Sequence, residues 1–333
     1  MRWSLLVVIA GSWPIGCGEP SPADVTPPDA PYSVRQDTLS WVDFTRLLEL
    51  PVRAYVPDGD DGPYPVVVFS PGVGTSRDHY ASLGQYWASH GYLALFLTHP
   101  GADEQAIYGD HWAVAAIVQA VIDFAEHVTA RTDHPRDVAF VLDQLEQSLR
   151  FKEVADLDRI AVAGHSFGAL TALALIGMQV DTLDGPARQM RDPRIQAAIA
   201  LSPPSPGVLG VADNAWDTLA APCLTFSGTL DWDPVNTDPT KRRAAFERAA
   251  APDQYLAWLR GGTHGVFDEQ SPWPLDNAAF REHRTAIEQV TTAFLDAHLR
   301  RDARAQQWLL SREIETTTGG GCTLEYKRVT PLP

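Results

Sequence analysis

A glycine-flanked serine is the sequence feature that most constrains what this chain can fold into. Residues 164–168 read Gly-His-Ser-Phe-Gly; they follow a short apolar run and precede a helix-compatible stretch, 169–176. A serine on a sharp turn between a strand and a helix needs small neighbours, because a Cβ at Gly164 or Gly168 would obstruct the bend. The context therefore predicts that Ser166 is a nucleophile whose hydroxyl stands clear of the sheet.

Apolar runs of strand length alternate with helical patterns along most of the 333 residues, 45% of which are hydrophobic. This alternation predicts one α/β domain with a mostly parallel, doubly wound central sheet flanked by helices. Residues 46–56 suggest an early antiparallel strand pair interrupted near Pro51. The other expected strands are 66–69, 93–97, 160–163, 195–201, 223–226 and 255–259, and the expected helices are 80–90, 112–127, 137–149 and 280–310.

The two ends of the chain differ in composition from this domain. Residues 1–16 have the basic start and short apolar run of a signal peptide, and Ile15-Gly16-Cys17 resembles the end of a bacterial lipoprotein signal. We expect lipidation of Cys17, with ordinary secretion as the alternative. The Pro- and Asp-rich segment up to residue 35 is typical of a disordered tether. The catalytic domain is predicted at 36–315, followed by an irregular tail at 316–333.

The formal net charge of −16 limits the possible partners. It disfavours binding to nucleic acid or to an anionic membrane face, since both would be repelled. Neutral or cationic substrates fit better, although a well-solvated surface explains the same charge. We expect a monomer that meets a membrane only through the N-terminal anchor.

Two cysteines remain after Cys17. An exported protein would allow Cys223 and Cys322 to form a disulfide. The alternative is two separate free thiols, because Cys223 begins an apolar strand where a small buried thiol is common.

A serine hydroxyl needs a histidine base and an acid that orients the base. In a fold with this kind of serine turn, the acid follows the serine along the chain, and the histidine follows the acid. His264 lies in a glycine-rich loop after the last strand, whereas His283 and His298 fall within the C-terminal helix. Asp231 leaves the preceding strand at its carboxyl end and is the favoured acid, with Asp233 as its rival.

The tetrahedral intermediate of such a reaction requires preorganised hydrogen-bond donors. The expected oxyanion hole consists of the backbone N–H groups of Phe167 and of Val73, which lies between Gly72 and Gly74 in a loop after a buried strand. A Cβ at either glycine would distort the loop that directs the donor.

No cofactor is implied by these residues. His99, Asp103 and His111 match no common zinc spacing, so we expect no metal site. The excursion at 103–134 is either a lid over the active site or a plain surface helix.

The chain resembles the α/β-hydrolase superfamily, and within it the platelet-activating-factor acetylhydrolase-like and dienelactone-hydrolase-like serine esterases. The resemblance rests on residues 66–74, 98–101, 136–143 with 164–168, and 200–204. Two departures matter. Pro71 replaces a histidine that often precedes the oxyanion-loop glycine, and the strand exit at Ser202-Pro203-Pro204 lacks the acid that mammalian-type acetylhydrolases carry there. The second departure favours Asp231.

We therefore expect an exported serine esterase that cleaves short-acyl esters through an acyl-enzyme. The resemblance implies acetylated phospholipids as candidate substrates. A cutinase-like polyester hydrolase, a serine amidase and a non-catalytic ligand-binding envelope lipoprotein are the alternatives.

Overall fold

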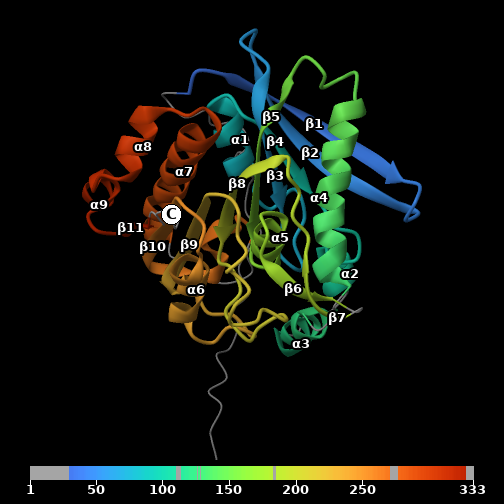
Figure 1. Ribbon diagram of the computed structural model, residues 1–333, viewed down its shortest axis with the longest axis vertical. Helices are drawn as coiled ribbons and strands as arrows, with labels where there is room; N and C mark the ends of the chain where they lie inside the picture. The colour runs from blue at the N-terminus through green and yellow to red at the C-terminus, as the bar shows by residue number, and fades with distance from the viewer. Residues whose placement is uncertain are drawn as a thin grey trace, which may run out of the picture.

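The computed structural model describes residues 30–109, 114–125, 127, 129–182, 185–270 and 277–327. The expected signal peptide, Cys17 and most of the tether lie outside these residues. Figure 1 shows a central sheet with helices on both sides, and the hairpin of β1 and β2 projecting from one side. Within the described residues, no helix is both long and apolar enough to span a bilayer.

Among these residues, the central sheet has nine strands in the order β1-β2-β4-β3-β5-β8-β9-β10-β11. The strands from β4 to β10 in this order run parallel, whereas β1, β2 and β11 pair antiparallel with their neighbours. The predicted mostly parallel sheet is therefore confirmed. The bounds are β1 Ser33–Asp43, β2 Leu48–Asp58, β3 Tyr64–Ser70, β4 Leu93–Leu97, β5 Ala155–His165, β8 Ile195–Leu201, β9 Cys223–Leu230, β10 Gln254–Thr263 and β11 Cys322–Lys327.

Strand β3 shows why the central strands are apolar without alternation. Val66 and Val68 face one core, while Val67 and Phe69 face the other, and all four are fully buried. Helices α4 (Ala130–Gln147), α5 (Phe167–Leu175) and α6 (Ala244–Arg248) cover the first face. Helices α1 (Ala81–Ser89) and α7 (Asn277–Leu299) cover the second. Parallel strands covered on both faces become continuous hydrophobic runs.

Shorter elements complete the fold. A separate hairpin pairs β6 with β7. Helices α2, α3 and α6 gather at the lower end of Figure 1, near the carboxyl ends of the parallel strands. The remaining bounds are β6 Gln179–Thr182, β7 Gly185–Gln189, α2 Glu104–Ile107, α3 Val114–Ala125, α8 Ala303–Leu309, α9 Glu313–Thr317 and the 3₁₀ turns η2 Pro239–Arg243 and η3 His264–Phe267.

Two expectations about the ends of the domain were wrong. Residues 46–56 do not form a strand pair: Pro51 lies inside the single strand β2, which pairs with β1 instead. The pairing of β2 with β4 begins only at Val52, so the missing N–H of Pro51 removes no bond of that ladder. The tail is not irregular throughout, because β11 adds an antiparallel edge strand beside β10 and packs Leu324 against the core.

The two cysteines are separate, buried free thiols, so the disulfide alternative is excluded. Strand β10 lies between them, and Cys223 is in register with Gln254 whereas Cys322 is in register with Leu259. Five residues along a strand span roughly 17 Å, far more than a disulfide can bridge. Burial raises the pKa of each thiol to about 12.

Candidate active site

Ser166 occupies the tight turn between β5 and α5. Its φ of +56° is unusual for a residue with a side chain, and its N–H donates to the Leu201 carbonyl at 2.9 Å. The flanking glycines are sterically required: a Cβ at Gly164 would lie 2.1 Å from the Gly168 carbonyl oxygen, and one at Gly168 would lie 1.9 Å from the Ser70 carbonyl oxygen. The strained turn holds the hydroxyl at the carboxyl edge of the sheet.

His264 reaches this hydroxyl from the end of β10. Its Nε2 is 3.0 Å from Ser166 Oγ, and its Nδ1 is 2.8 Å from Asp231 Oδ1. Because Nδ1 faces a carboxylate, it carries the proton, so that Nε2 is left as the acceptor for the Ser166 hydroxyl. The three predicted residues therefore lie in one hydrogen-bonded row.

Asp231 follows β9 and is completely buried. Its second carboxylate oxygen accepts hydrogen bonds from the hydroxyls of Ser227 (2.6 Å) and Ser202. Burial opposes ionisation, but the Arg242 charge and the hydrogen bonds from His264 and Ser202 outweigh it, and the pKa of Asp231 lies well below its usual value. Ser202 stands at the exit of β8, and this exit contributes a hydroxyl to the Asp231 carboxylate.

Arg242 supports Asp231 from η2 and was missed by the sequence analysis. Its side chain is 1% exposed; its Nε donates to the Asp231 carbonyl at 2.8 Å and lies 3.1 Å from Oδ1 of the same residue. One terminal nitrogen bonds the carbonyls of Ser202 and Pro203, and the other pairs with Asp233. Nothing in the run Lys241-Arg242-Arg243 distinguishes this buried arginine from a surface cation.

Asp233, the rival acid, has a different environment. It pairs with Arg242 and accepts the N–H of Val235 (2.8 Å) and of Asn236 (2.7 Å). Burial raises its pKa, but the charges of His264 and Arg242 prevail, and the net shift is downward. Its carboxylate is 3.8 Å from His264 Nε2, whereas Asp231 hydrogen-bonds Nδ1 directly. The geometry therefore favours Asp231 as the orienting acid.

A second histidine lies beneath the site. His165 Nε2 donates to the backbone carbonyl of His264 at 3.0 Å, and the Tyr80 hydroxyl donates to His165 Nδ1 at 2.9 Å. The same Tyr80 oxygen accepts the Gly72 N–H at 3.3 Å. Burial, assisted by the His264 charge, lowers the pKa of His165 to about 3, so its ring stays neutral. His165 and Tyr80 thus connect the backbone of His264 to the glycine loop.

The two expected oxyanion donors, the N–H groups of Val73 and Phe167, differ in their hydrogen bonding from the neighbouring N–H of Gly74. The Gly74 N–H donates to the Ala102 carbonyl at 2.7 Å. The Val73 and Phe167 N–H groups have no acceptor in the part of the chain that the structure describes. A Cβ at Gly72 would lie 3.4 Å from Ser166 Cβ, so the loop passes directly beside the nucleophile. Both unpaired amides are available to a substrate oxygen.

A cavity of about 210 Å³ opens beside Ser166 and His264. Gly74 and Tyr108 form part of its wall, and so do Glu104, His79 and Asp268. The His79 ring lies between the two carboxylates, 2.8 Å from Glu104 and 2.9 Å from Asp268. Burial lowers the pKa of His79, but the two carboxylates outweigh it and the net shift is upward.

The segment at 103–134, expected to be either a lid or a plain surface helix, divides into two parts. Its beginning, at α2 and Tyr108, lines the cavity beside Ser166, whereas none of the described side chains of α3 does. A larger cavity of about 730 Å³ lies beside α3 and α4, but neither Ser166 nor His264 lines it. We take the smaller cavity as the candidate active site because it contains the reactive groups.

The remaining histidine candidates lie elsewhere. His283 Nε2 bonds the Arg260 carbonyl at 2.9 Å, and His298 packs against Phe294, both on α7. His99, from the rejected metal cluster, bonds Ser70 and Asp137 instead, and His111 lies outside the described residues. Across the described ranges, no group of three or more His, Cys, Asp or Glu side chains is arranged to hold a metal ion.

Comparison with known proteins supports this fold. The family model described as "Platelet-activating factor acetylhydrolase, isoform II" matches residues 48–116, from β2 into α3. The matched segment contains the glycine loop, and the strand order with a serine turn after β5 extends the likeness beyond it. The chain has the α/β-hydrolase fold.

The chain is similar to two mammalian proteins. The platelet-activating factor acetylhydrolase of Canis lupus familiaris is 30% identical over 232 residues, which cover 61% of this chain and 48% of the relative. That of Bos taurus is 24% identical over 232 residues with the same coverage. The chain spans about half the length of the curated relatives it matches.

Proposed function

We propose that this protein is a serine carboxylic-ester hydrolase that acts on short-acyl esters through an acyl-enzyme. The proposal rests on one observation: Ser166 Oγ, the His264 ring and the Asp231 carboxylate form a continuous hydrogen-bonded row beside a cavity. Such a row supplies a nucleophile, a base and an orienting acid from side chains alone. The resemblance to acetylhydrolases supports the same reaction class.

In the first half of the reaction, Ser166 Oγ attacks the ester carbonyl carbon while His264 Nε2 takes the hydroxyl proton. The Asp231 carboxylate stabilises the imidazolium through Nδ1–H. The carbonyl oxygen becomes negative and accepts hydrogen bonds from the Val73 and Phe167 amides. His264 then donates its proton to the departing alcohol oxygen, and the carbon–oxygen bond of the ester breaks to leave an acylated Ser166.

The second half reverses these roles. His264 removes a proton from a water molecule, whose oxygen attacks the acyl carbon. The tetrahedral intermediate uses the same two amides. Collapse returns the proton from His264 to Ser166 Oγ and releases the carboxylic acid, so that the enzyme is restored without a net change.

The cavity supports a small acyl group and a neutral or cationic alcohol. Its volume of about 210 Å³ is below the roughly 300–1,000 Å³ typical of pockets for drug-sized ligands. Glu104 and Asp268 place two carboxylates on its wall, which disfavours an anionic group there. The relatives' names give platelet-activating factor as what those proteins act on. Acetylated phospholipids remain the candidate class that the resemblance implies.

The experiment compares p-nitrophenyl acetate, butyrate, octanoate and palmitate with the full-length wild type, Ser166→Ala, Asp231→Asn and Asp233→Asn. We expect activity that falls with acyl length, no burst of p-nitrophenol in Ser166→Ala, and a loss of 10³-fold or more for Asp231→Asn. Asp233→Asn should lose about tenfold or less, because Asp233 does not orient the His264 ring.

Other outcomes separate the alternatives. Residual turnover in Ser166→Ala would show that another residue is the nucleophile. Labelling of Ser166 by a fluorophosphonate without turnover of any ester would favour a serine amidase, and preferential release of soluble products from a polyester film would favour a cutinase-like enzyme. Absence of both labelling and turnover in a folded protein would favour a ligand-binding lipoprotein.

We further propose that the protein is exported and anchored by lipid at Cys17, and that it acts as a monomer. The motif Ile15-Gly16-Cys17 after a short apolar run supports the anchor. Membrane fractionation of wild type against Cys17→Ser tests it: the wild type should sediment with membranes and the variant should not. Identical fractionation of the two would contradict the anchor.

A further inference from the structure

A second serine, histidine and aspartate are joined by hydrogen bonds directly behind the active site. The Ser70 hydroxyl lies 2.7 Å from His99 Nε2, and His99 Nδ1 lies 2.7 Å from Asp137 Oδ2. All three side chains are almost completely buried, with Ser70 at 0% exposure. No substrate reaches Ser70, so this row has the bonding pattern of a catalytic triad without access to an ester.

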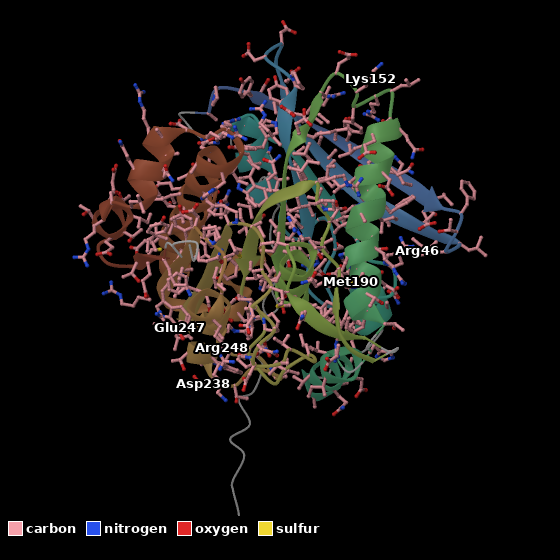
Figure 2. All side chains as sticks on the ribbon, viewed as in Figure 1. Arg46, Lys152, Met190, Asp238, Glu247 and Arg248 are labelled. Carbon is pink, nitrogen blue, oxygen red and sulfur yellow. The ribbon has the colours of Figure 1, made fainter. Side chains whose placement is uncertain are left out.

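The row is anchored at its acidic end by a cation from a distant part of the chain. Arg46 donates to Asp137 Oδ1 at 2.6 Å and, through Nε, to Asp43 at 2.6 Å. Figure 2 labels Arg46 where the turn between β1 and β2 approaches α4. Both oxygens of the Asp137 carboxylate are therefore occupied, one by Arg46 and the other by His99. This arrangement fixes the orientation of the His99 ring.

At its other end, the row includes Ser70, which lies where the glycine loop meets the turn that carries Ser166. Ser70 ends β3, is in register with Gly164, and immediately precedes Pro71-Gly72-Val73. Its carbonyl oxygen lies against Gly168, where an added Cβ would come within 1.9 Å. A movement of Ser70 would therefore shift the Val73 amide relative to Ser166.

Through His134, His99 also supports the turn that carries the Phe167 amide. The His99 ring stacks on His134 with centroids 3.7 Å apart and planes 5° apart, and His134 meets the Phe167 ring edge-on at 4.9 Å. Within the described ranges, His134 Nδ1 is buried and has no hydrogen-bond partner. Burial, with the adjacent His99, keeps the pKa of His134 well below its usual value, so the ring is neutral and is held by packing.

We propose that His99, oriented by Asp137, is a positioning residue that sets the spacing of the two oxyanion donors. Its hydrogen bond to Ser70 fixes the loop that carries Val73, and its stack on His134 fixes the turn that carries Phe167. This inference rests on the proposed esterase function and adds to it the structural support of the oxyanion hole. His99 touches no substrate.

The test separates transition-state stabilisation from simple stability. Ser70→Ala removes only the hydroxyl that binds His99, and His99→Phe keeps an aromatic ring against His134 while removing both hydrogen bonds. For each variant, kcat/KM for p-nitrophenyl acetate is compared with the inhibition constant of a short-chain trifluoromethyl ketone. Ser166 converts this ketone into a hemiketal whose oxyanion occupies the same donors.

A matched control is His298→Phe, which replaces a half-buried histidine packed among aromatic rings, on α7 and away from the site. Urea unfolding of every variant shows how much stability each one loses. Ser166→Ala is measured in the same series, so that failure of the proposed nucleophile is seen separately from failure of this inference.

We expect Ser70→Ala and His99→Phe to lower kcat/KM by about tenfold or more. The inhibition constant of the trifluoromethyl ketone should rise by a similar factor. His298→Phe should change neither, even where it loses as much stability. If Ser70→Ala keeps wild-type kcat/KM and wild-type ketone affinity, the row is only structural and the proposal is wrong. If His99→Phe does not fold, Ser70→Ala alone decides the question. If Ser166→Ala retains full activity, the proposed function fails instead.

Discussion

The guanidinium of Arg242 lies 3.1 Å from the Asp231 carboxylate in a site where both side chains are buried. Arg242 also pairs with Asp233, so a single cation balances two carboxylates next to His264. Replacing it with methionine would leave two buried charges without compensation. We expect Arg242→Met to lose about 3–5 kcal/mol of unfolding free energy in urea, together with most of the esterase activity.

Arg243→Met is the matched control for this change. Arg243 is the neighbouring residue, but it forms ion pairs with Glu247 and Glu325 at the surface. Exposed pairs of this kind contribute about 0–1 kcal/mol. An Arg242→Met variant as stable as Arg243→Met would mean that Asp231 and Asp233 do not depend on the buried cation.

We predict unequal effects on activity for alanine substitutions at the three residues of the glycine loop, 72–74. Gly74 has a φ of +72°, and a Cβ there would lie 2.1 Å from the Tyr108 hydroxyl oxygen. Gly74→Ala should therefore lower kcat/KM at least about tenfold, since both backbone strain and overlap displace the loop. Gly72→Ala should have a smaller effect than Gly74→Ala, because its methyl would make an ordinary van der Waals contact with Ser166 Cβ at 3.4 Å and would only narrow the cavity. Val73→Ala keeps the amide and should remain within about threefold of wild type. Equal kinetics in all three variants would remove Val73 from the oxyanion hole.

Tyr108 is predicted to limit the size of the acyl group. Its ring lines the small cavity beside Ser166 and approaches Gly74. Tyr108→Ala should raise the ratio of octanoate to acetate turnover by about tenfold or more, because a pocket discriminates each extra methylene by about 1–3 kcal/mol when space is short. Tyr108→Phe keeps the ring and serves as the control for the hydroxyl. An unchanged ratio in Tyr108→Ala would place the acyl group elsewhere.

We predict that His298 makes the free energy of unfolding depend on pH. Burial lowers its pKa to about 4, whereas an unfolded histidine titrates near 6.5. Between these values the unfolded chain binds a proton that the folded chain does not, so the contribution to stability decreases as the pH falls from about 6.5 towards 4. Urea unfolding at pH 7.5 and 4.5 should show a smaller loss for His298→Gln than for wild type, by about 2 kcal/mol. Parallel losses in the two proteins would contradict the buried neutral ring.

Short sequence patterns were enough to predict the local chemistry of this protein. A glycine on each side of Ser166 predicts the turn because only a residue without a Cβ fits there, and the continuous apolar runs predict strands buried on both faces. The same reasoning selected His264 and Asp231, since both follow strands whose carboxyl ends meet at one edge. Those inferences depend on short segments and on rules of chain order.

The folded structure was needed to identify the distant groups that support this chemistry. Arg242, Ser202 and His99 carry no local signal, because a buried polar group is specified by partners that come from other strands and helices. The edge strand β11 was also missed, since its pairing depends on β10 being available beside it. A sequence pattern reflects the local structure of one segment. The partners of a buried charge come from other segments, which meet only when the chain folds.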